Sequence, residues 1–128
     1  MVDHKSLCKN KTNKQILKNI RNKVEYQNTS TVDPVSEQIS QIKNIKIHGT
    51  SNNKSGVISF NIKNIHPQDL AQFLNEDNIC IRVGHHCAQP LLETLNETST
   101  ARASFYIYND FSDIDKLVDS IKSTISYF

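Results

Sequence analysis

Short stretches in which apolar and polar residues alternate predict β-strands in this chain. The clearest is 56–62, where alternate side chains would face a core: Ile58, Phe60 and Ile62. The same alternation predicts strands over 45–47 and 101–108. The continuous apolar run 79–83 predicts a further strand, so the chain contains enough strands for a small sheet.

Apolar residues spaced three or four positions apart predict helices between and after these strands. Pro67 and Asp69 suit the first turn of one helix, whose buried face would hold Leu70, Phe73 and Leu74. A short helix should begin at Leu91. The last helix should begin near Ser112, which forms a capping-box pattern with Asp115. Its apolar stripe consists of Ile114, Leu117, Val118, Ile121, Ile125 and Phe128.

The first part of the chain differs in character from the rest. A narrow apolar stripe predicts a helix over 12–26, and 27–34 has the composition of a linker. Pro34 would open a second short helix, with Asp33 as its cap. The apolar side of that helix would consist of Val35, Ile39 and Ile42.

From residue 45 onward the predicted order is β-β-α-β-α-β-α. Strands alternating with short helices predict an α/β (α+β) sandwich, a small mixed or antiparallel sheet covered by helices. The 128 residues are enough for one domain with a modest core. We therefore divide the chain into an unassigned basic segment and linker, 1–34, and a domain, 35–128.

The charge of the chain is uneven. Residues 1–23 hold seven basic residues against Asp3 alone, so this segment carries +6 and the remainder of the chain −4. A basic segment can bind nucleic acid, direct a protein to an organelle, or be a solvated or partner-docking segment. Since it has no aromatic residues for base stacking, we expect no nucleic-acid partner.

The cysteine count and the apolar runs indicate the compartment. Three cysteines are an odd number, which argues against a disulfide framework and for a reducing compartment. No apolar run is long enough to span a bilayer, so we expect no membrane association. The expected location is the cytoplasm, or an organelle matrix or stroma if the basic segment is a targeting sequence.

Reactive side chains are concentrated in 82–90, called the Cys87 loop below: Arg82, His85, His86 and Cys87. The loop would join a strand to a helix, where backbone N–H groups lower the pKa of a thiol. The residues alone leave three interpretations open. Cys87 could be a nucleophile with His85 and His86 managing its proton. The loop could be a zinc site, although adjacent ligands chelate poorly, or a structural loop with a buried thiol.

Two arginines lie near this loop in the predicted sheet. Arg102 lies among small residues, where its guanidinium would have room to bind a carboxylate through two hydrogen bonds. A solvated or salt-bridged Arg102 is the alternative. Arg82 could instead support the loop by hydrogen-bonding to its backbone carbonyls.

Residues 82–91, Arg-Val-Gly-His-His-Cys-Ala-Gln-Pro-Leu, resemble the active-site cysteine loop of the Suf-type (group II) cysteine desulfurases. These belong to the class V aminotransferase-like enzymes that use pyridoxal 5'-phosphate. The flanking segments resemble the same family in order and spacing: Gly56–Phe60, His66–Leu70, Thr100–Tyr106 and Tyr108–Asn109. The resemblance implies the C-terminal small domain of a fold-type I pyridoxal-phosphate enzyme.

The resemblance also implies a role for each matching position. Cys87 would take the sulfur atom of L-cysteine as a persulfide, leaving L-alanine and supplying iron–sulfur cluster assembly through a Suf-type acceptor protein. Arg102 would bind the carboxylate of the cysteine substrate. His85 and His86 would shape the loop or assist proton transfer, and Arg82 would support the loop.

In this family, a larger preceding domain holds pyridoxal 5'-phosphate and supplies its lysine. We find no counterpart of that domain in these residues and assign no cofactor-binding or metal-binding residue. One hypothesis is a truncated or split cysteine desulfurase, whose partner would be a chain that carries the cofactor domain. The alternative is a non-catalytic small domain acting as a sulfur carrier or desulfurase-binding module. Full-length family members are homodimers.

Overall fold

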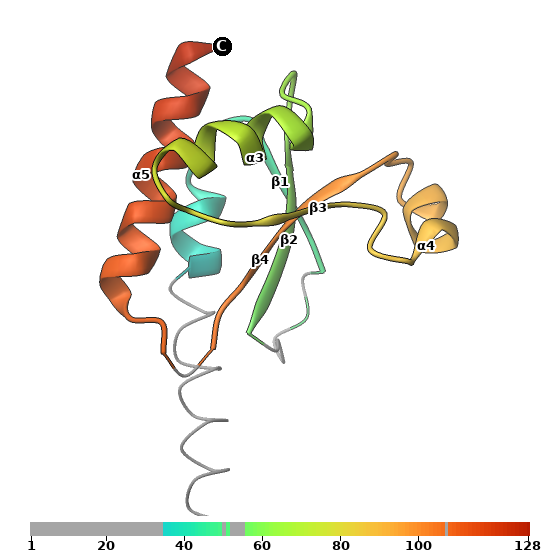
Figure 1. Ribbon diagram of the computed structural model, residues 1–128. Helices are drawn as coiled ribbons and strands as arrows, with labels where there is room; N and C mark the ends of the chain where they lie inside the picture. The colour runs from blue at the N-terminus through green and yellow to red at the C-terminus, as the bar shows by residue number, and fades with distance from the viewer. Residues whose placement is uncertain (1–34, 50, 52–55, 107) are drawn as a thin grey trace, which may run out of the picture.

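The computed structural model in Figure 1 describes residues 35–49, 51, 56–106 and 108–128. The predicted helix over 12–26, the linker and the proposed Asp33 cap lie outside the described residues. Residues 35–40 are helical and bury Val35 and Ile39 completely, while Ile42 packs against the core from the following turn. The apolar side expected for this short helix is therefore confirmed.

The four strands form one sheet in the order β1-β2-β4-β3. Every pair of neighbours is antiparallel, so the sheet is antiparallel rather than mixed. The strands are β1 (Ile45–His48), β2 (Val57–Ile62), β3 (Arg82–Gly84) and β4 (Thr100–Ser104). Because β4 lies between β2 and β3, the last strand in sequence places its residues beside both.

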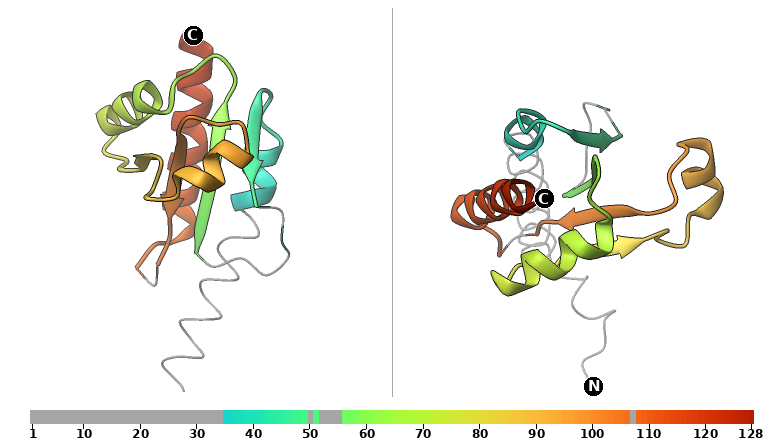
Figure 2. Two further views of the ribbon diagram at one scale, coloured as in Figure 1. Left: turned by 90° about the vertical axis from the view of Figure 1, so that its right-hand side faces the viewer. Right: turned by 90° about the horizontal axis from the view of Figure 1, so that it is seen from above.

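The helices are α3 (Pro67–Glu76), α4 (Gln89–Thr94) and α5 (Phe111–Tyr127), and the element order is the predicted one. Both α3 and α5 pack with residues 35–40 on one face of the sheet, where they enclose a single core with alternate residues of β2 and β4 (Figure 2). Short α4 lies apart from this layer, beside the ends of β3 and β4 (Figure 1). The other face, which we call the open face, is not covered by α3, α5 or residues 35–40.

Two strands are shorter than predicted, and in each case local hydrogen bonds explain the difference. Asn78, at φ 60°, ends α3, and the Ile79 N–H donates to the Leu74 carbonyl at 2.9 Å. Ile79 therefore bonds back to the helix and not to a neighbouring strand, and β3 begins only at Arg82. At the end of β4, the side chain of Asn109 accepts a hydrogen bond from the backbone N–H of Tyr106 at 3.0 Å, which forms a turn instead of a strand.

The helix starts also required correction. The capping box of α5 joins Asp110 and Asp113, not Ser112 and Asp115, so the helix begins at Phe111. Helix α4 begins two residues before Leu91, with Pro90 in its first turn. The predicted buried residues of α3 and α5 are largely confirmed, but two aromatic residues differ. Phe73 is half-buried and Phe128 is exposed, and their ring centroids lie 5.3 Å apart.

The core depends most on β2, whose Phe60 is 0% exposed. We expect Phe60→Ala to lower the free energy of unfolding by about 3–5 kcal/mol, because it leaves a cavity between the sheet and the helices. Val57 is 38% exposed on the opposite side of the same strand, so Val57→Ala should change it by no more than about 0.5 kcal/mol. Urea denaturation followed by circular dichroism measures both, and equal losses would contradict this assignment of faces.

Candidate functional site

The Cys87 loop joins β3 to α4, as predicted, and departs from extended backbone at Gly84. Gly84 has φ +123°, a conformation that residues with a Cβ rarely adopt. The Ala88 N–H then donates to the His85 carbonyl at 2.9 Å and closes a turn before α4. The thiol is therefore carried by a tight turn between two elements of regular structure.

The backbone at the centre of this turn is strained. His86 and Cys87 have φ values of 55° and 58°, so two consecutive residues other than glycine are left-handed. Such a conformation costs roughly 1–2 kcal/mol per residue in an L-amino acid. The loop must therefore be held in place by interactions with the rest of the domain.

The His86 side chain supplies one such interaction. Its Nε2 lies 3.1 Å from both the carbonyl oxygen and the hydroxyl oxygen of Thr100. A carbonyl oxygen can only accept, so neutral His86 carries its proton on Nε2 and donates it to Thr100. His86 Nδ1 is then an acceptor, and it is buried with no hydrogen-bond partner among the described residues.

The charge state of His86 is set mainly by its surroundings. Burial lowers the pKa of His86 below its ordinary value of 6.5, while the hydrogen bond to the Thr100 backbone opposes this shift. The positive charges of Arg102, Arg82 and His85 lower it further. The lowered pKa favours the neutral form of His86 at pH 7.

Arg82 and Arg102 occupy directly opposite positions on β3 and β4. Directly opposite residues project from the same side of a sheet, here the open face, and like charges so placed are unfavourable. Neither guanidinium forms an ion pair with a carboxylate in the described part of the chain. Arg102 Nε is also buried without a hydrogen-bond partner there. The pair is suited to an anion that those residues do not supply.

The row continues across the sheet, because Arg102 is opposite Ser59 and Ser59 is opposite His48. The His48 side chain is 7% exposed, and its Nε2 has no hydrogen-bond partner among the described residues. All the buried side-chain atoms without partners in that part of the chain lie on or beside the open face: His48 Nε2, Asn61 Oδ1, His86 Nδ1, Ser99 Oγ and Arg102 Nε. The open face is therefore polar, with hydrogen-bonding capacity unused.

The other predicted residues take simpler positions. Cys87 is an exposed free thiol, which differs from the buried thiol of the structural interpretation, and Cys80 is also exposed and free. His85 is exposed. Arg82 is exposed on β3, and its role in supporting the loop stays a prediction. Thr100, the acceptor for His86, was not singled out in the sequence, because only the pairing of β3 with β4 brings it near the loop.

Metal and membrane features were sought in the same residues. No three His, Cys, Asp or Glu side chains of the described ranges are grouped so that they could hold a metal ion, which leaves the zinc interpretation without a site there. None of the helices in those ranges is both long and apolar enough to cross a membrane.

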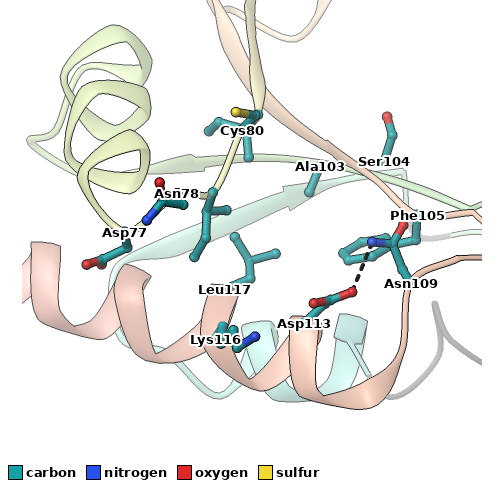
Figure 3. A pocket seen from close by; sticks show the side chains of 12 residues that line it. Asp77, Asn78, Cys80, Ala103, Ser104, Phe105, Asn109, Asp113, Lys116 and Leu117 are labelled. Atoms are coloured by element: carbon teal, nitrogen blue, oxygen red, sulfur yellow. Dashed lines mark hydrogen bonds between the residues drawn. The ribbon is translucent and has the colours of Figure 1, made fainter.

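The pocket shown in Figure 3 is not lined by the Cys87 loop. Its volume is about 420 Å³, and it lies between residues 77–81, the end of β4 and the first turns of α5. Cys80 and Asp113 line it, but none of the residues predicted for the site does. Another cavity, of about 520 Å³, is lined in part by Lys46, Asn61 and Glu97.

The lowered pKa of His86 predicts a pH dependence of stability. As the pH falls below about 6.5, the unfolded chain takes up a proton at this residue before the folded chain does, so the free energy of unfolding should decrease. His86→Gln should remove this part of the dependence, whereas His85→Gln, at an exposed position, should retain it. Urea denaturation at pH values between 7.5 and 5 measures the difference, and parallel curves for His86→Gln and the parent would contradict it.

The chain is similar in sequence to known proteins. Residues 13–117 match the family described as aminotransferase class-V. The chain is 48% identical over 93 residues to a probable cysteine desulfurase of Staphylococcus aureus (strain Mu50), a match that covers 72% of this chain and 22% of the relative. A probable cysteine desulfurase of Halalkalibacterium halodurans is 44% identical over 92 residues. The chain thus spans about a fifth of the length of these curated relatives.

Solved structures show the same similarity. The apo cysteine desulfurase of Thermococcus onnurineus NA1 superimposes with a TM-score of 0.79 at 29% identity, covering 84% of this chain and 27% of that one. The Escherichia coli cysteine desulfurase CsdA, in an S-sulfonic acid form, gives a TM-score of 0.76 at 30% identity, covering 81% and 26%. With its fold, its cysteine loop and a profile match over most of its length, the chain belongs to the class-V aminotransferase family.

Proposed function

We propose that this chain carries the sulfur-accepting part of a Suf-type (group II) cysteine desulfurase. In this function Cys87 takes the sulfur atom of L-cysteine to form a persulfide, and L-alanine is the other product. One observation supports it above the others. The exposed thiol of Cys87 lies on a strained turn, and His86 binds this turn to Thr100 of β4. Arg102, two residues after Thr100, has no anionic partner among the described residues.

Cys87 is the proposed nucleophile because its thiol is exposed and free. A thiolate is the reactive form of cysteine, and its attack on the substrate sulfur forms the S–S bond of the persulfide. The C–S bond of the substrate breaks in the same exchange, and its carbon gains a proton to become the methyl group of alanine. The persulfide keeps the transferred sulfur for a later acceptor.

Arg102 is the proposed site for the carboxylate of L-cysteine. A guanidinium can donate two parallel hydrogen bonds to a carboxylate, and the unused Arg102 Nε is one available donor. Arg82, directly opposite, adds a second positive charge on the same face. A bound carboxylate would relieve the repulsion between the two guanidinium groups, so substrate binding and charge balance favour the same arrangement.

The two histidines have different proposed roles. His86 holds the loop through Thr100, and its unprotonated Nδ1 could accept a proton or hydrogen bond. His85 is exposed, so a bound substrate could reach its imidazole. We assign proton handling near Cys87 to this pair, with His86 also supporting the loop.

The family is dependent on pyridoxal 5'-phosphate, which supplies the electron sink for breaking the C–S bond. The described residues do not form a site for this cofactor. All the lysines among them are exposed, whereas the cofactor requires a lysine within an enclosed site: Lys43, Lys46, Lys63, Lys116 and Lys122. Lys46 is also paired with Glu97. The residues described here therefore account for sulfur acceptance and substrate binding only.

The family depends on the cofactor, but the described residues form no site for it. This difference supports a second candidate, a small domain that carries sulfur or binds a desulfurase without turnover of its own. In either case we propose L-cysteine or a desulfurase as the sulfur source and a Suf-type protein as the acceptor.

We further propose a cytoplasmic location. A homodimer, as in full-length desulfurases, is the proposed assembly for the catalytic form.

Sulfur loading tests both candidates. With ³⁵S-labelled L-cysteine, pyridoxal 5'-phosphate and an active desulfurase, we expect label on the Cys87 peptide, with Cys87→Ser abolishing it. Cys80→Ser, which removes the other exposed thiol of the described residues, should leave it unchanged. Loading by the chain alone supports the desulfurase. Loading that requires an active desulfurase supports the sulfur carrier, and label retained in Cys87→Ser would rule out Cys87 as the acceptor.

The role of Arg102 predicts a dependence on the substrate carboxylate. A hydrogen bond to a charged group contributes about 1.5–3 kcal/mol, so Arg102→Gln should lower kcat/KM for L-cysteine roughly 10- to 100-fold in the form that turns over. Cysteamine lacks the carboxylate and serves as the matched control, because its kcat/KM should be nearly unchanged by the substitution. An equal loss with both compounds would show that Arg102 acts elsewhere.

A further inference from the structure

Glu97 contacts α4 through its backbone and the sheet through its side chain. It lies three residues before Thr100, which binds His86 of the Cys87 loop. Helix α4 ends in a Schellman motif, in which the Glu97 N–H donates to the Leu92 carbonyl at 2.9 Å and the Asn96 N–H to the Glu93 carbonyl at 3.1 Å. Asn96 has φ 55°, as this motif requires. The backbone of Glu97 therefore fixes where α4 stops.

The side chain of Glu97 is bound to the sheet at the same time. Its Oε1 accepts a hydrogen bond from Lys46 Nζ of β1 at 2.8 Å, and its Oε2 accepts one from Asn61 Nδ2 of β2 at 3.0 Å. The side chain is only 18% exposed, and His48 Nε2 lies 3.8 Å from Oε1. Both oxygens of one carboxylate thus connect two neighbouring strands to the segment that follows α4.

A second bond from Asn61 strengthens the same connection. Its Nδ2 also donates to the Ser99 carbonyl at 2.9 Å, immediately before β4 begins at Thr100. The turn of residues 95–99 is therefore held at Glu97 and at Ser99. Thr100 follows directly, and its carbonyl and hydroxyl receive the Nε2–H of His86.

We propose that Glu97 is a positioning residue for Cys87, an inference that rests on the function proposed above. By fixing the turn 95–99 against β1 and β2, Glu97 places both Thr100 and the end of α4. His86 then has a fixed acceptor, and the loop keeps its left-handed backbone at Cys87. Glu97 does not touch the thiol and acts only through Asn61, the turn and Thr100.

The tautomer of His86 provides a direct readout of this chain of contacts, without substrate or cofactor. In the ¹⁵N-labelled parent chain, long-range ¹H–¹⁵N spectra should show His86 as the Nε2–H tautomer, with the signal assigned by its loss in His86→Gln. Glu97→Ala should convert this single form to a mixture of tautomers. It should also change the rate at which iodoacetamide alkylates the Cys87 peptide.

Glu93→Ala is the matched control, since it removes an exposed carboxylate of α4 whose contact is a 3.5 Å hydrogen bond from Gln89. It should leave both the tautomer and the alkylation rate as in the parent. A folded Glu97→Ala with His86 still in the Nε2–H form and unchanged alkylation would overturn the proposal. A parent chain in which His86 is not in that form would overturn it as well.

If circular dichroism shows that Glu97→Ala does not fold, Lys46→Ala decides the question. The Lys46 side chain is 60% exposed, so its removal leaves the core intact and takes away one of the two donors to Glu97. A partial loss of the Nε2–H form supports the proposal, and no change contradicts it. Sulfur retained on Cys87→Ser would refute the proposed function without altering these spectra, so the two failures are distinguishable.

Discussion

The hydrogen bond from the His86 imidazole to Thr100 is the interaction on which the arrangement of the reactive loop depends. Cys87 and His86 both adopt a backbone conformation that their side chains disfavour, and a tight turn alone would relax from it. The imidazole ties the turn to β4, at a residue that is itself 2% exposed. The two residues are 14 positions apart in the sequence, and the bond joins the loop that follows β3 to the start of β4.

The sheet serves two purposes through its two faces. Toward α3, α5 and residues 35–40 it presents only apolar side chains, and this layer carries the core. Toward the open face it presents arginine, histidine, serine and asparagine, several with hydrogen-bonding atoms that no described residue satisfies. The apolar core and the residues of the proposed site thus lie on opposite sides of the same strands, through the alternation of side chains along each strand.

Much of the fold could be predicted because alternation and helical spacing report burial directly. The inward residues of β2 and the stripe of α5 were evident for that reason, apart from the end of the helix at Phe128. Boundaries were harder, since they depend on single hydrogen bonds such as that from the Tyr106 N–H to Asn109. Ser112 and Asp115 have the same spacing as Asp110 and Asp113, so the pattern could not choose between two capping boxes.

The site was predictable in its residue types and not in its geometry. The Cys87 loop and Arg102 were apparent from their motif, but the facing of Arg82 and Arg102 requires the register of β3 with β4. Asn61 and Glu97 carry no motif, and the contact of Thr100 with His86 becomes apparent only when the strands are paired. Nonlocal partners of this kind are invisible to periodicity, which reports only on neighbours along the chain.

The helix ends at Asn78 and Asn96 have a consequence for the unfolded chain. Glycine is the usual residue at such left-handed positions, yet this chain has only three glycines. Among the described residues, four of the left-handed ones are asparagines: Asn44, Asn64, Asn78 and Asn96. Asparagine accepts this conformation at modest cost and explores fewer backbone states than glycine when unfolded. The entropy lost on ordering these turns is therefore smaller than a glycine-rich version of the same fold would lose.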